Sequence, residues 1–354
     1  MRMTQTNISS ERRLQIKETV YNALLHSNTC NLPIKIKAIV RSYKNIRLIS
    51  YSKHMKKFNI SYEKMKTYAQ TKDAFTDYYT SKNLYCIYYN DLDTNIVTSN
   101  RYRWNIAHEL GHVLLDHHKT NDKTRIFRCT LSDKEYNILE EEADYFAQLI
   151  LVPHAALYGL KINDARSLKI ICKISNPASR KRYYEYHHWL LSPATPDEYD
   201  KRIFCYYYNF IYKRQCKTCG ASFIQRYGKY CSICGNKTIQ WGDGNMIYPK
   251  LETYENGKLL ECPRCKNEET NLEGDYCQIC GRSIVNYCSS DDCSKNPLPS
   301  NARYCPICGN HSTFYDLGFL NDWNYTEPGS GFMNIPDPVD ESLPFYQEEE
   351  LPFD

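Results

Sequence analysis

Hydrophobic positions recur with helical spacing near the start of the chain. Over residues 12–25, Leu14, Val20, Ala23 and Leu24 fall on one side of a helical projection. Charged and polar residues occupy most of the positions between them. This arrangement is typical of an amphipathic helix that packs on a core, so we predict a helix here.

Two β-like runs predict a small sheet. Residues 34–49 begin with helical spacing and end in an extended run at residues 46–49. Residues 84–89 are rich in aromatic side chains, and Asn90 and Asp91 follow them with turn-forming chemistry. We therefore expect a small sheet that includes these runs.

Two longer helices are predicted after the second run. The first covers about residues 101–116 and is apolar over most of its surface, so it should be buried. The second covers residues 132–152, because Ser132 can cap its start with Glu135 in the capping-box position. Pro153 marks its end. Mostly helical segments with a small sheet indicate the α+β class.

Cysteine spacing changes the picture beyond residue 212. The chain has 354 residues and 17 cysteines, and 12 of the cysteines form three groups with an eleven-residue spacer between two close pairs. The groups are Cys216, Cys219, Cys231 and Cys234; Cys262, Cys265, Cys277 and Cys280; and Cys288, Cys293, Cys305 and Cys308. Each matches a tetrahedral zinc ribbon, which predicts up to three structural zinc ions and small β ribbons. In the third group, the first pair is more widely spaced than in the other two.

These patterns divide the chain into an α+β domain, a connecting segment, three ribbons and a tail. The second ribbon is preceded by a hairpin, predicted from the turn signal Asn256-Gly257. The tail holds several Pro, Gly and acidic residues, so we expect it to be loosely ordered. The expected boundaries, in order, are residues 1–195, 196–212, 213–240, 241–283, 284–312 and 313–354.

Charge is unevenly distributed along the chain. The net charge is +4, but residues 1–72 hold 15 Lys and Arg against 3 acidic residues, and residues 337–354 hold 7 acidic residues. No arginine-rich or aromatic nucleic-acid motif accompanies the basic start, so we interpret it as a solvated helical surface. No signal-like or membrane-spanning apolar run is visible, so we expect a cytoplasmic protein without membrane contact. Regularly spaced cysteines of cytoplasmic proteins bind metal more often than they form disulfides.

The segment His108-Glu109-Leu110-Gly111-His112 carries the candidate chemistry. His108 and His112 lie one helical turn apart, so both imidazoles can bind one zinc ion. Glu109 is placed to act as the general base of a zinc peptidase, taking a proton from water activated by the metal. We interpret His117 and His118, which follow the predicted ligand turn, as surface residues.

A third zinc ligand is predicted from the next helix. Around its apolar face, Glu140 and Glu142 lie on opposite flanks, while Glu141 points away. Asp144 falls one turn after Glu140 on the same flank, where it can orient a histidine N–H. We choose Glu140 as the ligand and keep Glu142 as the alternative.

The sequence resembles the ImmA/IrrE-type metallopeptidases. The resemblance rests on residues 103–112, residues 140–153, the strand that ends at Asn90, and the segment from Ile174 to Arg182. It covers roughly residues 15–190. One departure is Asp144, where many members carry Asn, and it leaves the orienting role intact.

The resemblance implies a zincin-like fold, one catalytic zinc ion and endopeptidase activity on a helix-turn-helix transcriptional repressor. The ribbons and the acidic tail are expected to contact a protein partner, because Lys and Arg are mixed with Asp and Glu along the ribbons. Nucleic acid stays a weaker alternative partner. The alternative function is a non-catalytic protein- or nucleic-acid-binding regulator, with zinc ribbons as its binding modules and a protease-like sensor domain.

Overall fold

The computed structural model describes residues 8–71, 73–120, 132–293 and 296–325. The chain divides into two compact units, and the boundary between them along the sequence lies between Ile211 and Tyr212. The first unit is α+β, and the second contains the cysteine groups. In the described parts of the chain, no helix combines the length and apolar character needed to cross a membrane.

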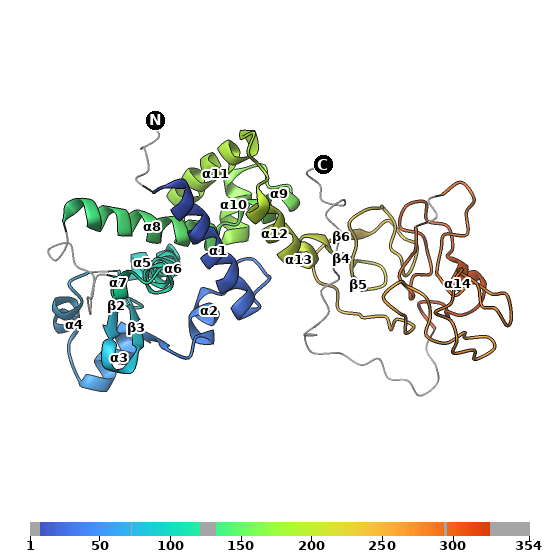
Figure 1. Cartoon of the computed structure of the whole chain (residues 1–354), viewed down its shortest axis with the longest axis horizontal. Coiled ribbons are helices and arrows are strands. Elements are labelled where there is room, and N and C mark those ends of the chain that lie inside the picture. The colour runs from blue at the N-terminus through green and yellow to red at the C-terminus, as the bar shows by residue number, and fades with distance from the viewer. Residues whose placement is uncertain (1–7, 72, 121–131, 294–295, 326–354) are drawn as a thin grey trace. The chain divides into compact units, whose positions relative to one another are not determined.

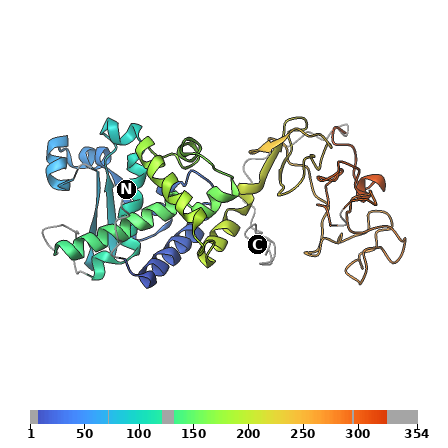
Figure 2. The same cartoon turned by 90° about the horizontal axis from the view of Figure 1, so that it is seen from above.

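A three-stranded sheet forms one side of the first unit, in the order β1 (Ile46–Ser50), β3 (Leu84–Tyr89), β2 (Ala74–Tyr79). β1 is parallel to β3, whereas β2 is antiparallel to it, with Thr76 opposite Ile87. The strands lie side by side in Figure 2. Both β-like runs of the sequence are therefore strands, and β2 was not predicted.

Helix α6 (Arg101–Leu114) lies between the sheet and α8 (Asp133–Leu151), as Figure 1 shows with α6 seen nearly end-on. The side of α8 that packs toward the core is lined by Ala143, Phe146, Ala147 and Ile150, all fully buried. The predicted capping box of α8 is present, with Ser132 and Glu135 satisfying each other's backbone N–H groups. Both predicted long helices are confirmed to within a few residues.

Helix α1 (Ser10–Ser27) packs against α8 and confirms the predicted first helix. Its buried face differs from the expectation at one position. Leu14 is 57% exposed, whereas Ile16 is fully buried together with Val20. Residues 16, 20, 23 and 24 follow the i, i+4, i+7, i+8 spacing of one helical face, and Leu14 is about 200° away from Ile16.

The remaining helices of the first unit complete the cover around α6, α8 and the sheet. They are α2 (Ile36–Ser42), α3 (Tyr51–Phe58), α4 (Tyr62–Ala69), η1 (Thr80–Lys82), α5 (Thr94–Thr98), α7 (His117–Thr120), α9 (His154–Gly159), α10 (Ala165–Cys172), α11 (Asn176–Leu191), α12 (Glu198–Tyr206) and α13 (Tyr208–Tyr212). The helical element expected from Ile174 to Arg182 is part of α11, which is longer than expected.

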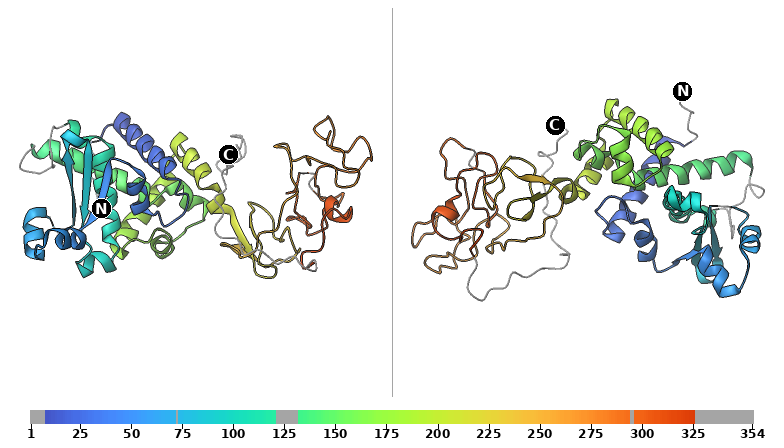
Figure 3. Two further views of the ribbon diagram at one scale, coloured as in Figure 1. Left: turned by 90° about the horizontal axis from the view of Figure 1, so that it is seen from below. Right: turned by 180° about the vertical axis from the view of Figure 1, so that it is seen from behind.

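The second unit has little regular secondary structure (Figure 3). Its small sheet has the order β5 (Ser222–Ile224), β4 (Lys213–Cys216), β6 (Ile239–Trp241), with all pairs antiparallel. The predicted turn at Asn256-Gly257 joins an antiparallel bridge between Thr253 and Leu259.

Part of the segment expected to be a loose tail is ordered. Residues 313–316 form α14, and Phe314 is fully buried in a cluster with Leu259 and Leu320. Burial of these apolar side chains offsets the entropy lost when the chain becomes ordered. The high content of Pro, Gly and acidic residues hid this anchor in the sequence. The rest of the expected tail, residues 326–354, lies outside the described residues.

Candidate metal centres

Three side chains from α6 and α8 converge on one point. His108 Nε2 lies 3.1 Å from His112 Nε2, and the Glu140 carboxylate lies 3.4 Å from the first and 3.5 Å from the second. Nitrogen and oxygen ligands at zinc-binding distances around a tetrahedral ion are about 3.3–3.5 Å apart. The spacing of these atoms therefore fits a zinc ion with three protein ligands.

The two candidate carboxylates of α8 lie on different sides of that helix. Glu140 faces the histidines, whereas Glu142 is buried and binds Arg12 of α1. Asp144, one turn after Glu140, accepts a hydrogen bond from His108 Nδ1 over 2.9 Å. This bond places the proton of His108 on Nδ1 and leaves the lone pair of Nε2 for a metal.

The charges around this point favour a bound cation. Burial lowers the pKa of His112 to about 3, so its imidazole is neutral and can act as a ligand. Burial also lowers the pKa of His108, but hydrogen bonds to Asp144 and Glu140 outweigh it and raise the value to about 10. The carboxylates thus stabilise one positive charge at this site, and a divalent ion can supply it in place of the proton.

A cavity of about 600 Å³ opens beside these groups. Glu109 lines it together with the two histidines and Glu140, and aromatic side chains such as Phe75 and Trp104 contribute apolar wall. The hydroxyl of Thr76 in β2 donates a 2.8 Å hydrogen bond to Glu109 Oε2. This contact fixes the direction of the Glu109 carboxylate. It has no local signal in the sequence, because Thr76 lies 33 residues away.

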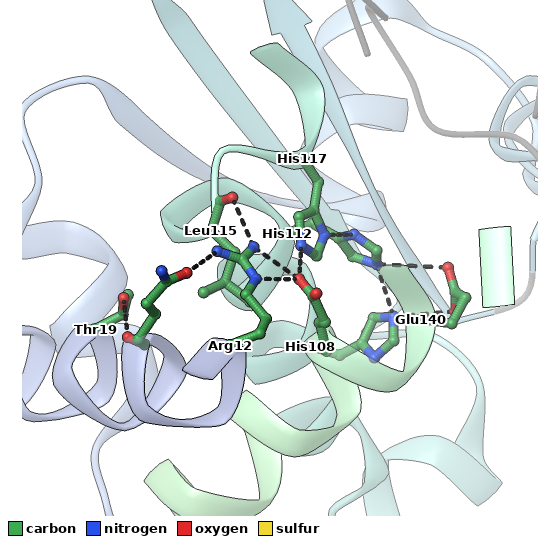
Figure 4. A network of polar contacts seen from close by, with 9 residues as sticks. Arg12, Thr19, His108, His112, Leu115, His117 and Glu140 are labelled. Atoms are coloured by element: carbon green, nitrogen blue, oxygen red, sulfur yellow. Dashed lines mark hydrogen bonds and ion pairs between the residues drawn. The ribbon is translucent and has the colours of Figure 1, made fainter. Parts of the chain in front are cut away.

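His117 is not the surface residue that the sequence suggested. It is 1% exposed, and its Nδ1 lies 2.9 Å from His112 Nδ1. Its Nε2 lies 2.9 Å from Glu142, whose carboxylate also accepts from Arg12 over 2.7 Å. Figure 4 shows Arg12, His117, His112 and His108 in one connected set of contacts. The prediction failed because α6 ends at Leu114 and the chain then turns through Asp116, which has a positive φ of 58°.

The network assigns the ring protons of both histidines. Burial raises the pKa of Glu142, but hydrogen bonds from His117 and Arg12 outweigh it and lower the value to about 2, so this carboxylate accepts. His117 donates to it from Nε2, and a metal at His112 Nε2 requires the ring proton of His112 on Nδ1, so that His112 donates from Nδ1 and His117 accepts at its own Nδ1. In this arrangement, Nε2 of His112 keeps a lone pair and lies beside Glu140 and His108.

His118 was also expected at the surface and is also buried, at 2% exposure. Its ring packs against the rings of Tyr78 and Tyr85, with centroids 6.3 Å and 5.8 Å away. Both tyrosines belong to the sheet, so His118 ties α7 to it. The short α7 offered too few residues for a periodicity to reveal this.

Gly111 allows α6 and α8 to approach closely. A Cβ at this position would lie 3.2 Å from Ala143 Cα and 3.2 Å from Phe146 Cβ, which is tighter than normal packing. The absent side chain therefore sets the separation of the two helices that supply the converging ligand groups.

Each of the three cysteine groups converges in the second unit. Their Sγ···Sγ distances are 3.6 and 3.7 Å in the first, 3.6 and 3.5 Å in the second, and 3.4 and 3.7 Å in the third. Four sulfurs bound to one zinc ion are about 3.8 Å apart, whereas a disulfide would require about 2.05 Å. The groups therefore fit Cys₄ zinc ribbons, including the third with its wider first pair.

Comparison with known families agrees with the site in the first unit. Residues 55–187 match the Peptidase M78 family, described as the IrrE N-terminal-like domain. The matched range includes β2, β3, α6 and α8. His108, Glu109 and His112 belong to α6, and Glu140 belongs to α8. A comparison with curated proteins gave no match. Residues 55–187 are therefore similar to the IrrE N-terminal-like domain of the Peptidase M78 family, and three Cys₄ clusters that fit zinc ribbons follow them in the chain.

Proposed function

We propose that this chain is a zinc-dependent endopeptidase that cuts a regulatory protein, specifically a helix-turn-helix transcriptional repressor. The observation that carries the catalytic part is the position of Glu109, which shares one cavity with the converging groups of His108, His112 and Glu140. A metal-binding scaffold needs the ligands but has no use for a carboxylate held beside them. The repressor class rests on the family resemblance alone.

Each residue of the site would have its own role in the reaction. Zinc held by His108, His112 and Glu140 would supply Lewis acidity, which acidifies water and polarises a carbonyl group. Glu109 would take the proton of the attacking water and pass it to the leaving amine. Thr76 would hold the Glu109 carboxylate in the direction that this transfer needs.

The cavity suits an extended peptide. Ala74, Phe75 and Thr76 of β2 line it, and β2 lies at one edge of the described sheet. An extended segment can add to such an edge through backbone hydrogen bonds, with its side chains in alternating directions. A flexible segment of a repressor would meet this requirement, because a folded helix presents no backbone groups for pairing.

Glu109→Gln tests the catalytic proposal. The amide keeps the shape and the acceptor for Thr76 but cannot take a proton, so cleavage should fall by at least about a hundredfold while zinc content is unchanged. Glu63→Gln is the matched control, since Glu63 is exposed and pairs with Lys66 on α4. Both variants should be co-expressed with repressors from neighbouring genes, and fragments identified by mass spectrometry. Full cleavage by the Glu109 variant would rule out this general base.

The binding-regulator alternative is supported by the separate unit that holds three Cys₄ groups. It predicts that Glu109→Gln keeps the cellular function, whereas replacing cysteines of a ribbon abolishes it. The protease proposal predicts loss in the first case, so a reporter gene controlled by the repressor separates the two.

A further inference from the structure

The three cysteine groups share more than their cysteines. The second pair of each group lies in the same six-residue motif, Tyr-Cys-x-Ile-Cys-Gly, where x varies. The motif occupies residues 230–235, 276–281 and 304–309. We call these segments knuckle 1, knuckle 2 and knuckle 3.

Knuckles 1 and 3 pair with each other through reciprocal backbone hydrogen bonds. The N–H groups of Lys229 and Tyr230 donate to the carbonyl of Pro306 over 2.8 Å and 3.1 Å. In return, the N–H groups of Arg303 and Tyr304 donate to the carbonyl of Ser232 over 2.8 Å and 3.0 Å. Ser232 and Pro306 occupy the same position of the motif, so the two halves of the contact are equivalent.

The tyrosine of each paired knuckle covers the glycine of the other. A Cβ at Gly309 would lie 2.6 Å from the ring of Tyr230, and a Cβ at Gly235 would lie 2.8 Å from the ring of Tyr304. Only glycine permits this approach, and both glycines also have positive φ. The motif is therefore self-complementary: each copy provides the donors, the acceptor, the ring and the space for a ring.

Knuckle 2 has the same parts without a partner for them in the described chain. Tyr276 is 66% exposed and Ile279 is 73% exposed, and a Cβ at Gly281 would meet nothing within 4 Å. Among the described residues, no hydrogen bond uses the N–H groups of Asp275 and Tyr276 or the carbonyl of Gln278. These are the positions through which knuckles 1 and 3 pair.

We propose that knuckle 2 is a dimerisation surface whose occupant is knuckle 2 of a second copy of this chain. Because the motif is self-complementary, two copies can pair about a two-fold axis, each Tyr276 covering the Gly281 of the other. Tyrosine is also among the side chains that are enriched at protein interfaces. Asp275 occupies the position that Lys229 and Arg303 have in the observed pair, and its carboxylate accepts a 2.8 Å hydrogen bond from the hydroxyl of Tyr287. This pairing does not depend on the proposed peptidase activity.

Sedimentation velocity of the full-length, zinc-loaded protein over a concentration series tests the pairing. The wild type should form a dimer, and Tyr276→Ala should raise its dissociation constant by at least about tenfold, as expected for an interface tyrosine. Tyr276 is largely exposed, so its loss should leave each chain folded with its zinc. Tyr227→Ala is the matched control, because Tyr227 is 63% exposed but lies outside the motifs. It should leave the dissociation constant unchanged.

A photo-cross-linking amino acid at position 276 gives the geometry. In a mixture of isotopically light and heavy chains, it should form cross-links between chains to the peptide that contains Gln278 and Gly281. A protein that stays monomeric up to about 1 mM, which corresponds to an association free energy weaker than about −4 kcal/mol, would overturn the proposal. A dimer that Tyr276→Ala leaves intact, or cross-links only to another segment, would do the same.

Discussion

Replacing His117 with phenylalanine should weaken metal binding at the histidine–glutamate centre and leave the cysteine centres loaded. Phenylalanine keeps a flat ring at a position that is 1% exposed, so the packing of α7 should survive. The two ring nitrogens are lost, and with them the acceptor for His112 Nδ1 and one donor to Glu142. The imidazole of His112 is then no longer held with its Nε2 lone pair toward Glu140.

The size of the effect follows from the burial of the groups involved. The side chain of His112 is only 4% exposed, so water cannot readily replace the lost acceptor, and a buried N–H without a partner costs about 1–3 kcal/mol. Removing the partner of a metal-binding histidine typically lowers metal affinity by about 10–100-fold, or about 1.4–2.7 kcal/mol, which agrees. Glu142 keeps its 2.7 Å ion pair with Arg12, so no buried carboxylate is left alone.

Competition with a coloured chelator measures this affinity directly. The variant should release about one zinc ion per chain at chelator concentrations that the wild type resists, with the remaining ions unaffected. His187→Phe is the matched control, because His187 is exposed on α11. Unchanged affinity at all centres in the His117 variant would show that the contact between the two imidazoles does not orient the ligand. Loss of the cysteine-bound zinc as well would point to general unfolding.

Total zinc in the wild type should be about four ions per chain by elemental analysis, and Cys277→Ser should reduce it by about one. Gly111→Ala should lower the free energy of unfolding by about 1–3 kcal/mol in urea titration and weaken zinc binding at the histidine–glutamate centre, because the new Cβ would push α6 from α8. Burial and the charge of Asp197 raise the pKa of Asp200 to about 6, so the folded chain holds this proton more tightly than the unfolded chain. Stability should therefore fall as pH rises from about 4 to about 6, and Asp200→Asn should remove that fall and be more stable at pH 7 by up to about 3 kcal/mol.

The sequence predicted those parts of the site that lie along one helix. His108 and His112 face the same way because four residues make one turn, and the same geometry separates Glu140 from Glu141. The cysteine groups were equally local, since each close pair is its own signal. In both cases the chemistry and the secondary structure are encoded within about twenty residues.

The contacts that the sequence did not show join segments far apart along the chain. Thr76 reaches Glu109 because β2, like β3, packs on α6, and the sequence of β2 had no clear periodicity. Arg12 reaches Glu142 across 130 residues because α1 packs on α8. Such pairs depend on how helices and strands pack, and hydrophobic periodicity reports only which face is buried.

Glu142 illustrates the difference between a helical face and a position in the fold. Their angular positions around the helix left Glu140 and Glu142 as alternative candidates for one ligand position. They lie on opposite flanks of the apolar face. The structure places different polar partners against each flank. Glu140 faces the Nε2 atoms of both histidines, and Glu142 faces His117, which contacts Nδ1 of one of them. Helix α8 thus acts on His112 in two ways. Glu140 lies beside its Nε2, and Glu142 binds His117, which in turn contacts its Nδ1. Because both carboxylates act on the same imidazole, we expect the variants Glu140→Gln and Glu142→Gln to lower zinc affinity at the same centre, with the larger loss at Glu140, which would contact the ion.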